Sequence, residues 1–209
     1  GTKSAIDAGQ VLRKRLAITG STLRARSVAY KAVLAQELGI SRTPLREALF
    51  RLIQDGYITD VPHGGMFVAS FDLAQLESML NLRTILTPYL CNQLLRNARK
   101  EDVDACEQEM YSLISMEQDM ALVDVFRADL RFHAMLSELS GDTILADILR
   151  KLQFMSSMAL IPHARDYYYN RGTVKDEYFE IFRHIRERDR DALEAAIKQH
   201  IPRYVLQRS

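Results

Sequence analysis

The chain has 209 residues, of which 47% are hydrophobic and 26% are charged, and this is the composition of an ordinary soluble protein with room for two small domains or one large one. No apolar run approaches the roughly 18 residues that a membrane-spanning helix needs, so no membrane association is expected. The net charge of +1 hides an asymmetry, because residues 1–70 carry ten Lys and Arg against five Asp and Glu, whereas residues 71–209 carry eighteen against twenty-two. A basic N-terminal part joined to a mildly acidic remainder is typical of a DNA-binding domain linked to a domain with another task.

The cysteines and the N-terminus indicate the compartment. Cys91 and Cys106 lie inside helical patterns and not in a C-x-x-C spacing, which favours reduced thiols. The start, GTKSAIDAG, lacks the charged-then-apolar layout of a signal peptide. A cytoplasmic protein is therefore expected.

A first helix is predicted at residues 6–18, and a helix-turn-helix at residues 34–56, LAQELGISRTPLREALFRLIQDG. Gly39 can take the left-handed conformation that ends the first helix of this motif. The second helix begins near Ser41 or Thr43, either of which could cap it. Pro44 falls in its first turn, where no intrahelical donor is needed. Its buried stripe is Leu45, Ala48, Leu49, Leu52 and Ile53.

The opposite face of this second helix carries Arg42, Thr43 and Arg46 at its N-terminal end. Two guanidiniums one turn apart, at the positive end of a helix dipole, suit an anionic surface that is read bidentately. The major groove of duplex DNA offers phosphates and guanine edges of this kind. The alternative is a solvated arginine face on an ordinary helical hairpin.

Two β-prone runs, residues 57–60 and 66–69, flank the turn Pro62-His63-Gly64-Gly65. A helix-turn-helix followed by a hairpin is the layout of a winged helix. The run GISRTPLREAL, with the glycine-containing hairpin after it, resembles the GntR family of bacterial transcription regulators. That resemblance implies contacts to DNA from the following positions: Ser41, Arg42, Thr43, Arg46, His63 and Gly64.

Beyond Phe71 every segment has helical periodicity, which predicts a boundary between a winged-helix domain at residues 1–70 and an all-helical domain at residues 71–209. The family resemblance implies that the first domain binds DNA and that the second binds an effector and dimerises. Asp72 is expected to cap the first helix of the second domain. Six helices with short links are expected, and they span residues 73–96, 101–118, 121–140, 143–161, 173–187 and 190–205. A loop or short turn is expected at residues 165–172. The predicted fold class is mainly α, an N-terminal winged helix-turn-helix followed by an all-α six-helix bundle.

Three side chains that can bind metal face the interior of this expected bundle. Asp129 and His133 are four residues apart and point to the same side of the third helix, and His200 lies on the apolar stripe of the last helix. A buried carboxylate must be paired, neutral or metal-bound, because a lone buried charge is costly. The residues leave two interpretations open: a buried Asp–His hydrogen bond beside a satisfied core histidine, or a metal site.

The segments DLRFH, SGDTIL and AAIKQH resemble the FCD effector domain of the FadR-like branch of the same family. The resemblance implies a divalent metal, often Zn or Ni, that is held by Asp129, His133, His200 and one further histidine and helps to bind a small carboxylate. Tyr178 stands where that further histidine is expected, so it would hydrogen-bond an effector or a metal-bound water instead. Arg83 matches a position that often faces the effector. The alternative for Arg83 is a surface arginine or a salt bridge to a neighbouring helix.

The leading hypothesis is a ligand-responsive transcription regulator that is not an enzyme. It would bind a palindromic double-stranded DNA operator as a homodimer and respond to a small carboxylate. The alternative from another class is a metal-dependent hydrolase or lyase that uses Asp129, His133 and His200; no Glu or Asp on the same stripe is evident as a general base. A third hypothesis is an architectural DNA binder whose helical domain only dimerises.

Overall fold

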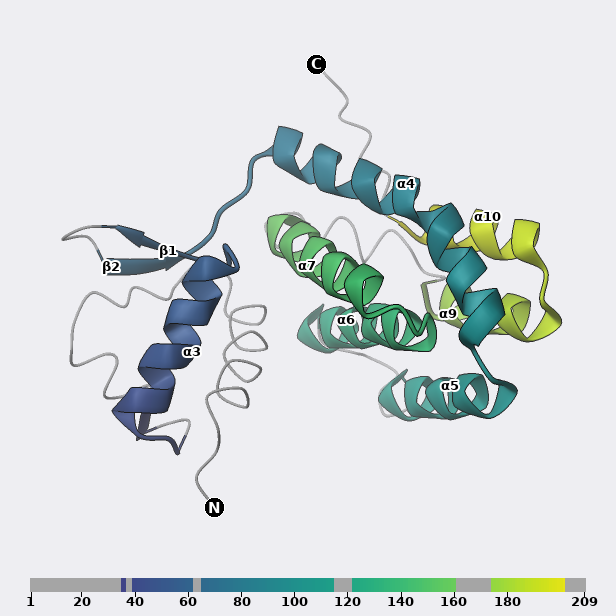
Figure 1. Ribbon diagram of the computed structural model, residues 1–209, viewed down its shortest axis with the longest axis horizontal. Coiled ribbons are helices and arrows are strands. Elements are labelled where there is room, and N and C mark those ends of the chain that lie inside the picture. Colours follow the sequence, from purple (N-terminus) through teal and green to yellow (C-terminus); the bar gives the residue numbers. More distant parts are fainter. Residues whose placement is uncertain (1–34, 37–38, 62–64, 115–121, 161–173, 202–209) are drawn as a thin grey trace. The chain divides into compact units, whose positions relative to one another are not determined.

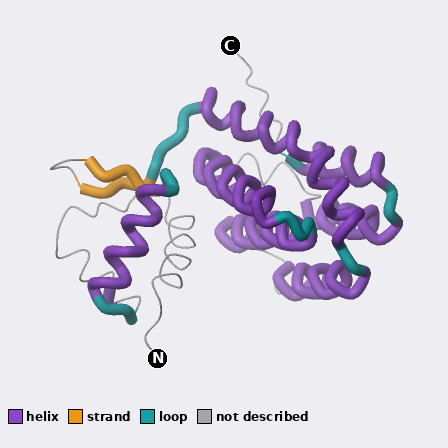
Figure 2. Tube along the Cα trace, in the orientation of Figure 1, coloured by secondary structure: helices purple, strands orange, loops and turns teal. Residues whose placement is uncertain are grey.

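The computed structural model describes residues 35–36, 39–61, 65–114, 122–160 and 174–201. The chain divides into two compact units, Gly1–Phe71 and Asp72–Ser209. The described residues are mainly helical, with one two-stranded sheet in the first unit (Figure 2). The predicted fold class is confirmed. The helix expected at residues 6–18, the turn residues His63 and Gly64, and the loop expected at 165–172 lie outside the described residues.

A glycine turn leads into the second helix of the helix-turn-helix. Gly39 has φ +63°, as predicted. Its N–H donates to Gln36 O at 3.1 Å, and the N–H of Ile40 donates to Ala35 O at 3.0 Å. This bond pair is a Schellman motif, which satisfies carbonyls that the end of a helix leaves open.

The second helix, α3, spans Arg42–Gln54 and buries Leu45, Ala48, Leu49 and Leu52. Ser41 is its N-cap residue with extended backbone, but the Ser41 side chain makes no capping hydrogen bond. Of the two residues expected to cap the helix, Ser41 therefore occupies the N-cap position, whereas Thr43 lies inside α3. The helix ends at Gln54, and Gly56 follows in the turn after it with φ +79°.

The hairpin after α3 is the wing. Strand β1, Ile58–Val61, pairs antiparallel with strand β2, Gly65–Val68, in a register that places Ile58 opposite Val68. Tyr57 and Ile58 are buried, so the base of the hairpin contributes to the core of the first unit.

The second unit is built from helices within the described residues (Figure 1). Their bounds are α4 Leu73–Asn97, α5 Lys100–Ile114, α6 Leu122–Leu139, α7 Thr143–Leu160, α9 Val174–Glu187 and α10 Arg190–His200. Helix α7 packs against α4 and α6, α10 packs against α4 and α9, and α5 packs against α6 and α9. Large side chains from α6, α9 and α10 fill one interior: Phe132, Met135, Leu136, Tyr178, Ile181, Phe182, Ile185, Leu193 and Ile197.

The helix ends follow local chemistry. Asp72 caps α4 as predicted, in a capping box where the Asp72 carboxylate accepts from Gln75 N and the Gln75 side chain accepts from Asp72 N. The last helix was expected to reach residue 205, and this is wrong, because α10 ends at His200 and Ile201 is extended at φ −62°, ψ 126°. The residue before a proline is disfavoured in the α region, and Pro202 follows Ile201.

None of the described helices combines the length and apolar character needed to cross a membrane.

Candidate functional site

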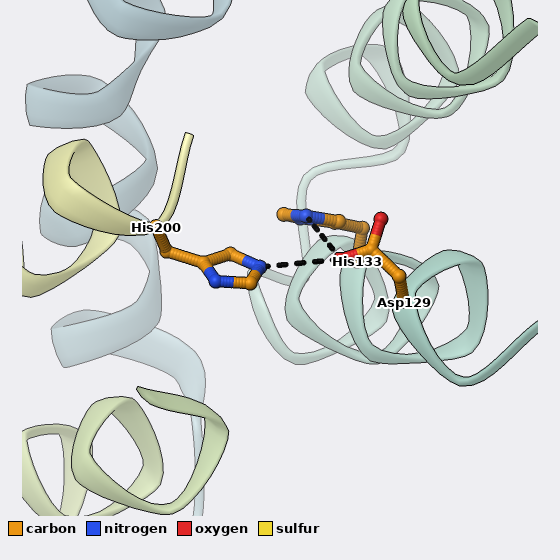
Figure 3. Close-up of side chains that lie close together, drawn as sticks. All are labelled: Asp129, His133 and His200. Carbon is orange, nitrogen blue, oxygen red and sulfur yellow. Dashed lines mark ion pairs between the residues drawn. The ribbon is translucent and has the colours of Figure 1, made fainter. Parts of the chain in front are cut away.

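Asp129 and His133 of α6 and His200 of α10 meet inside the helical unit, as Figure 3 shows. Asp129 Oδ1 lies 3.7 Å from His133 Nε2 and 3.4 Å from His200 Nε2. One candidate ligand atom from each residue lies within 4.8 Å of the others. The structure therefore brings together the three residues expected to form the metal site.

Aromatic packing fixes the walls of this cluster. The ring of Phe132 is fully buried, and its centroid lies 4.5 Å from that of Tyr178 and 5.3 Å from those of His133 and His200. Phe132 is on α6, Tyr178 on α9 and His200 on α10. The Phe132 ring therefore packs against side chains of two other helices and fixes how the three helices surround the polar groups. The apolar wall also strengthens every electrostatic interaction inside it.

Each carboxylate oxygen of Asp129 accepts a hydrogen bond. Gln153 Nε2 of α7 donates to Oδ2 at 2.9 Å, and the Tyr178 hydroxyl donates to Oδ1 at 3.3 Å. On the far side of the cluster, His200 Nδ1 lies 2.8 Å from Glu177 Oε2. Asp129, His200 and Glu177 are all nearly buried, with side-chain exposures of 12%, 2% and 12%.

Arg83 of α4 completes the cluster. Its exposure is only 5%, which excludes the surface-arginine interpretation. Arg83 Nη2 lies 3.1 Å from His133 Nε2, and Nη1 donates to Ser156 Oγ at 3.3 Å. A guanidinium has only donors, so His133 Nε2 must be the acceptor, which defines its tautomer.

The charges of the cluster follow from burial and from these neighbours. Burial opposes ionisation of Asp129, but the histidines and Arg83 outweigh it and hold the pKa of the Asp129 carboxyl well below its usual range. Burial and the positive charge of Arg83 lower the pKa of His133 well below its usual value. Burial also opposes protonation of His200, yet Asp129 and Glu177 outweigh it and raise the pKa of His200. At neutral pH Asp129 is ionised and His133 is neutral.

A small cavity of about 20 Å³ lies beside the cluster and is lined by Arg83, His133 and Gln153 with Thr87, Ser137 and apolar side chains of α4, α6, α7 and α10. This volume suits a water molecule or an ion and is too small for an organic acid. A bound acid therefore requires these side chains to move apart.

The residues expected to contact DNA lie together where they are described. Ser41, Arg42, Thr43 and Arg46 are all exposed at the N-terminal end of α3, whose first turn holds no acidic residue. The arrangement presents two cations and two hydroxyls on one helix end.

Two polar partners, Gln153 and Glu177, were missed by the sequence reasoning. Gln153 could have been found from the sequence, because Gln153, Ser156 and Ser157 are polar residues at helical spacing beside and within the otherwise apolar segment FMSSMAL. No sequence feature singled out Glu177, since an acidic residue in the first turn of a helix is ordinary. His184, the histidine of α9, is buried but lies between Glu180 and Glu187 and is not part of the Asp129 cluster.

Comparison with known families gives two matches along the chain. Residues 31–68 match the model of the bacterial regulatory proteins of the gntR family. Residues 78–203 match the model of the FCD domain. The first match covers the helix-turn-helix at residues 34–56 and the wing, and the second covers most of the helical unit with the whole Asp129 cluster.

Individual relatives agree with these matches. The HTH-type transcriptional repressor RspR of Escherichia coli is 23% identical over 166 residues, which are 78% of this chain and 71% of RspR. The Nta operon transcriptional regulator of Aminobacter aminovorans is 24% identical over 175 residues, 82% of this chain and 79% of that protein. Among solved structures, E. coli McbR/YncC superposes with a TM-score of 0.76 at 16% identity, covering 96% of this chain and 94% of that chain, which supports the fold.

Proposed function

This chain belongs to the GntR family of bacterial transcription regulators and carries an FCD effector domain, and from that premise we propose that it binds a palindromic operator as a homodimer and responds to a small carboxylate. Residues 1–70 bind the DNA and residues 71–209 bind the effector and dimerise. The matching families and relatives are regulators and not enzymes, which decides against the hydrolase or lyase alternative.

The observation that carries the proposal is the exposed N-terminal end of α3. Arg42 and Arg46 are one turn apart and solvent-exposed, and the Schellman turn at Gly39 orients the helix start. In this arrangement Arg42 and Arg46 contact phosphates or guanine edges in the major groove. Ser41 and Thr43 hydrogen-bond phosphate oxygens, and His63 and Gly64 contact the minor groove.

Selection from a random-sequence duplex library tests this assignment. The wild-type protein is expected to enrich a palindrome, and Arg46→Ala is expected to lose the preference at one base pair of each half-site, since a bidentate contact contributes about 1–3 kcal/mol of discrimination. The matched control is Arg51→Ala, which removes an exposed cation from the last turn of the same helix. An Arg46→Ala variant with unchanged selectivity would remove the assignment.

The homodimer is supported by the outward surface of α4 and α7, here called the α4–α7 face. Between Glu77 and Arg96, the exposed positions of α4 carry no charge, and they are Ser78, Asn81, Leu82, Ile85, Tyr89 and Asn92. Ile85 is 69% exposed, and Ile144 and Ile148 on α7 are 74% and 45% exposed. The lack of charge at the exposed positions of α4 around Leu82, Ile85 and Tyr89 is typical of the centre of an interface.

The size of the α4–α7 face fits a second copy of the chain. Helix α4 has 25 residues and α7 has 18, so their shared length is roughly 27 Å and their joint width about 20 Å, a projected area on the order of 500 Å². This is the same order as the roughly 800 Å² per partner of a standard interface. Ile85→Asp is expected to reduce the solution mass from a dimer to 24.0 kDa, whereas Leu113→Asp, at an exposed leucine of α5, keeps the dimer.

The donor set of the Asp129 cluster fits a divalent metal with three protein ligands. Asp129, His133 and His200 would hold the metal, and Gln153 and Glu177 supply the outer hydrogen bonds that metal-bound carboxylates and histidines usually have. A bound Zn²⁺ or Ni²⁺ would supply a Lewis acid for a carboxylate oxygen. His133 Nε2 has one lone pair, so ligation there excludes the contact with Arg83.

Arg83 and Tyr178 are the effector-binding residues in this proposal. A carboxylate is the natural partner of a buried guanidinium because it accepts two parallel hydrogen bonds. A thermal-shift panel of mono- and dicarboxylates tests the assignment: an acid that raises the unfolding temperature of the wild type is expected to lose that effect in Arg83→Leu. An equal rise in both proteins would contradict it.

A further inference from the structure

Two consecutive residues at the start of α9 hold two of the three candidate metal ligands. Glu177 Oε2 lies 2.8 Å from Nδ1 of His200 on α10, and the hydroxyl of Tyr178 donates to Oδ1 of Asp129 on α6 at 3.3 Å. One short segment of α9 therefore contacts ligands from both neighbouring helices.

The Glu177 contact determines what His200 can do. An ionised carboxylate is an acceptor only, so it holds the proton on Nδ1. With the proton on Nδ1, the lone pair of the neutral imidazole is on Nε2, the atom that faces Asp129 Oδ1 at 3.4 Å. A histidine that donates to a carboxylate in this way is also a stronger base and a better metal ligand. The burial of both side chains strengthens the effect.

The Tyr178 contact determines the plane of the Asp129 carboxylate. Gln153 holds Oδ2 and Tyr178 holds Oδ1, so the group cannot rotate without losing one of two buried hydrogen bonds. Each carboxylate oxygen has two lone pairs, which leaves one on Oδ1 for another partner.

We propose that Glu177 and Tyr178 are positioning residues that compensate for the absent fourth ligand. They fix the tautomer of His200 and the orientation of Asp129, so that the three side chains of Asp129, His133 and His200 would hold the metal together. This inference rests on the metal site of the proposed function. It adds to that site a role for Glu177, which is not itself a ligand.

Metal affinity of the full-length protein tests the proposal. Metal is removed with a chelator, and the dissociation constants for Zn²⁺ and Ni²⁺ are measured by competition with a chromophoric chelator. Glu177→Ala is expected to weaken binding by about 10–100-fold, the usual effect of losing such a partner. Glu177→Gln, which keeps an acceptor for Nδ1–H, is expected to lie between Glu177→Ala and the wild type. The matched control is Glu180→Ala, an exposed glutamate of the same helix, with unchanged affinity.

Tyr178→His gives an effect of the opposite sign. A fourth imidazole in place of the phenol is expected to tighten metal binding, whereas Tyr178→Phe weakens it, because Asp129 loses its hydrogen bond. Circular dichroism of each metal-free variant separates weak binding from failure to fold. Tight wild-type binding with an unchanged Glu177→Ala variant would overturn the role of Glu177 and leave the metal site in place. Absence of wild-type binding would overturn both.

Discussion

Replacing Asp129 with Asn tests whether the buried cluster is a connected network. Asp129 as a whole residue is 8% exposed. Its carboxylate accepts hydrogen bonds from Gln153 and Tyr178 and lies beside two histidines and the buried guanidinium of Arg83. Asparagine removes the negative charge and replaces one acceptor oxygen with a donor NH₂. The NH₂ group then faces either Gln153 Nε2 or the Tyr178 hydroxyl, so one of the two present hydrogen bonds is lost or must reverse. Arg83 also loses a nearby anion.

The expected cost of Asp129→Asn is about 3–5 kcal/mol, the usual loss when one member of a buried ionic group is removed. For a unit of this size, 1 kcal/mol lowers the unfolding temperature by roughly 3 °C, so a decrease of about 10 °C is expected in circular dichroism at 222 nm with EDTA present. Asp147→Asn is the matched control, because the Asp147 side chain is 75% exposed and its ion pair adds little. If Asp129→Asn melted within about 1 °C of the control, the reasoning about the network would be refuted.

Three further predictions concern other parts of the chain. Gly141→Ala is expected to destabilise the helical unit by about 1–2 kcal/mol in urea unfolding, because φ is +66° and the new Cβ would lie 3.1 Å from Asn97 Nδ2; an unchanged midpoint would contradict this. Burial raises the pKa of the Cys91 thiol to about 12, so at pH 8 the native protein should react slowly with a thiol reagent at Cys91 and only as fast as it opens; labelling at the rate of a free thiol would oppose this. Binding to mixed-sequence duplex DNA should weaken steeply with salt; a salt-independent affinity would exclude phosphate contacts.

Periodicity and capping chemistry predicted most of the fold. Asp72 and Gly39 each act at the helix end that the sequence predicted for them, because caps and left-handed turns are local properties. The end of α10 was misjudged, since the apolar stripe continues past His200 while Pro202 forces Ile201 out of the helix. Ser41 occupies the N-cap position without its side chain capping.

The candidate site was predicted in part. Asp129 and His133 share a helix face by spacing alone, and His200 was expected at the interior from its stripe. The contacts of Arg83 with His133 and of Glu177 with His200 join residues 50 and 23 positions apart. Such contacts depend on how α4, α6, α9 and α10 pack. Helical periodicity predicts which face of a helix is buried, but it does not predict which helix packs against that face.

The most direct test of the account is the effect of an acid on DNA binding. Fluorescence anisotropy gives the Kd for a selected duplex with and without a saturating concentration of the carboxylate that raises the unfolding temperature most. A regulator that couples its two units should change this Kd by about 5-fold or more, in either direction. An acid that stabilises the protein through Arg83 and leaves the Kd for DNA unchanged would contradict the account.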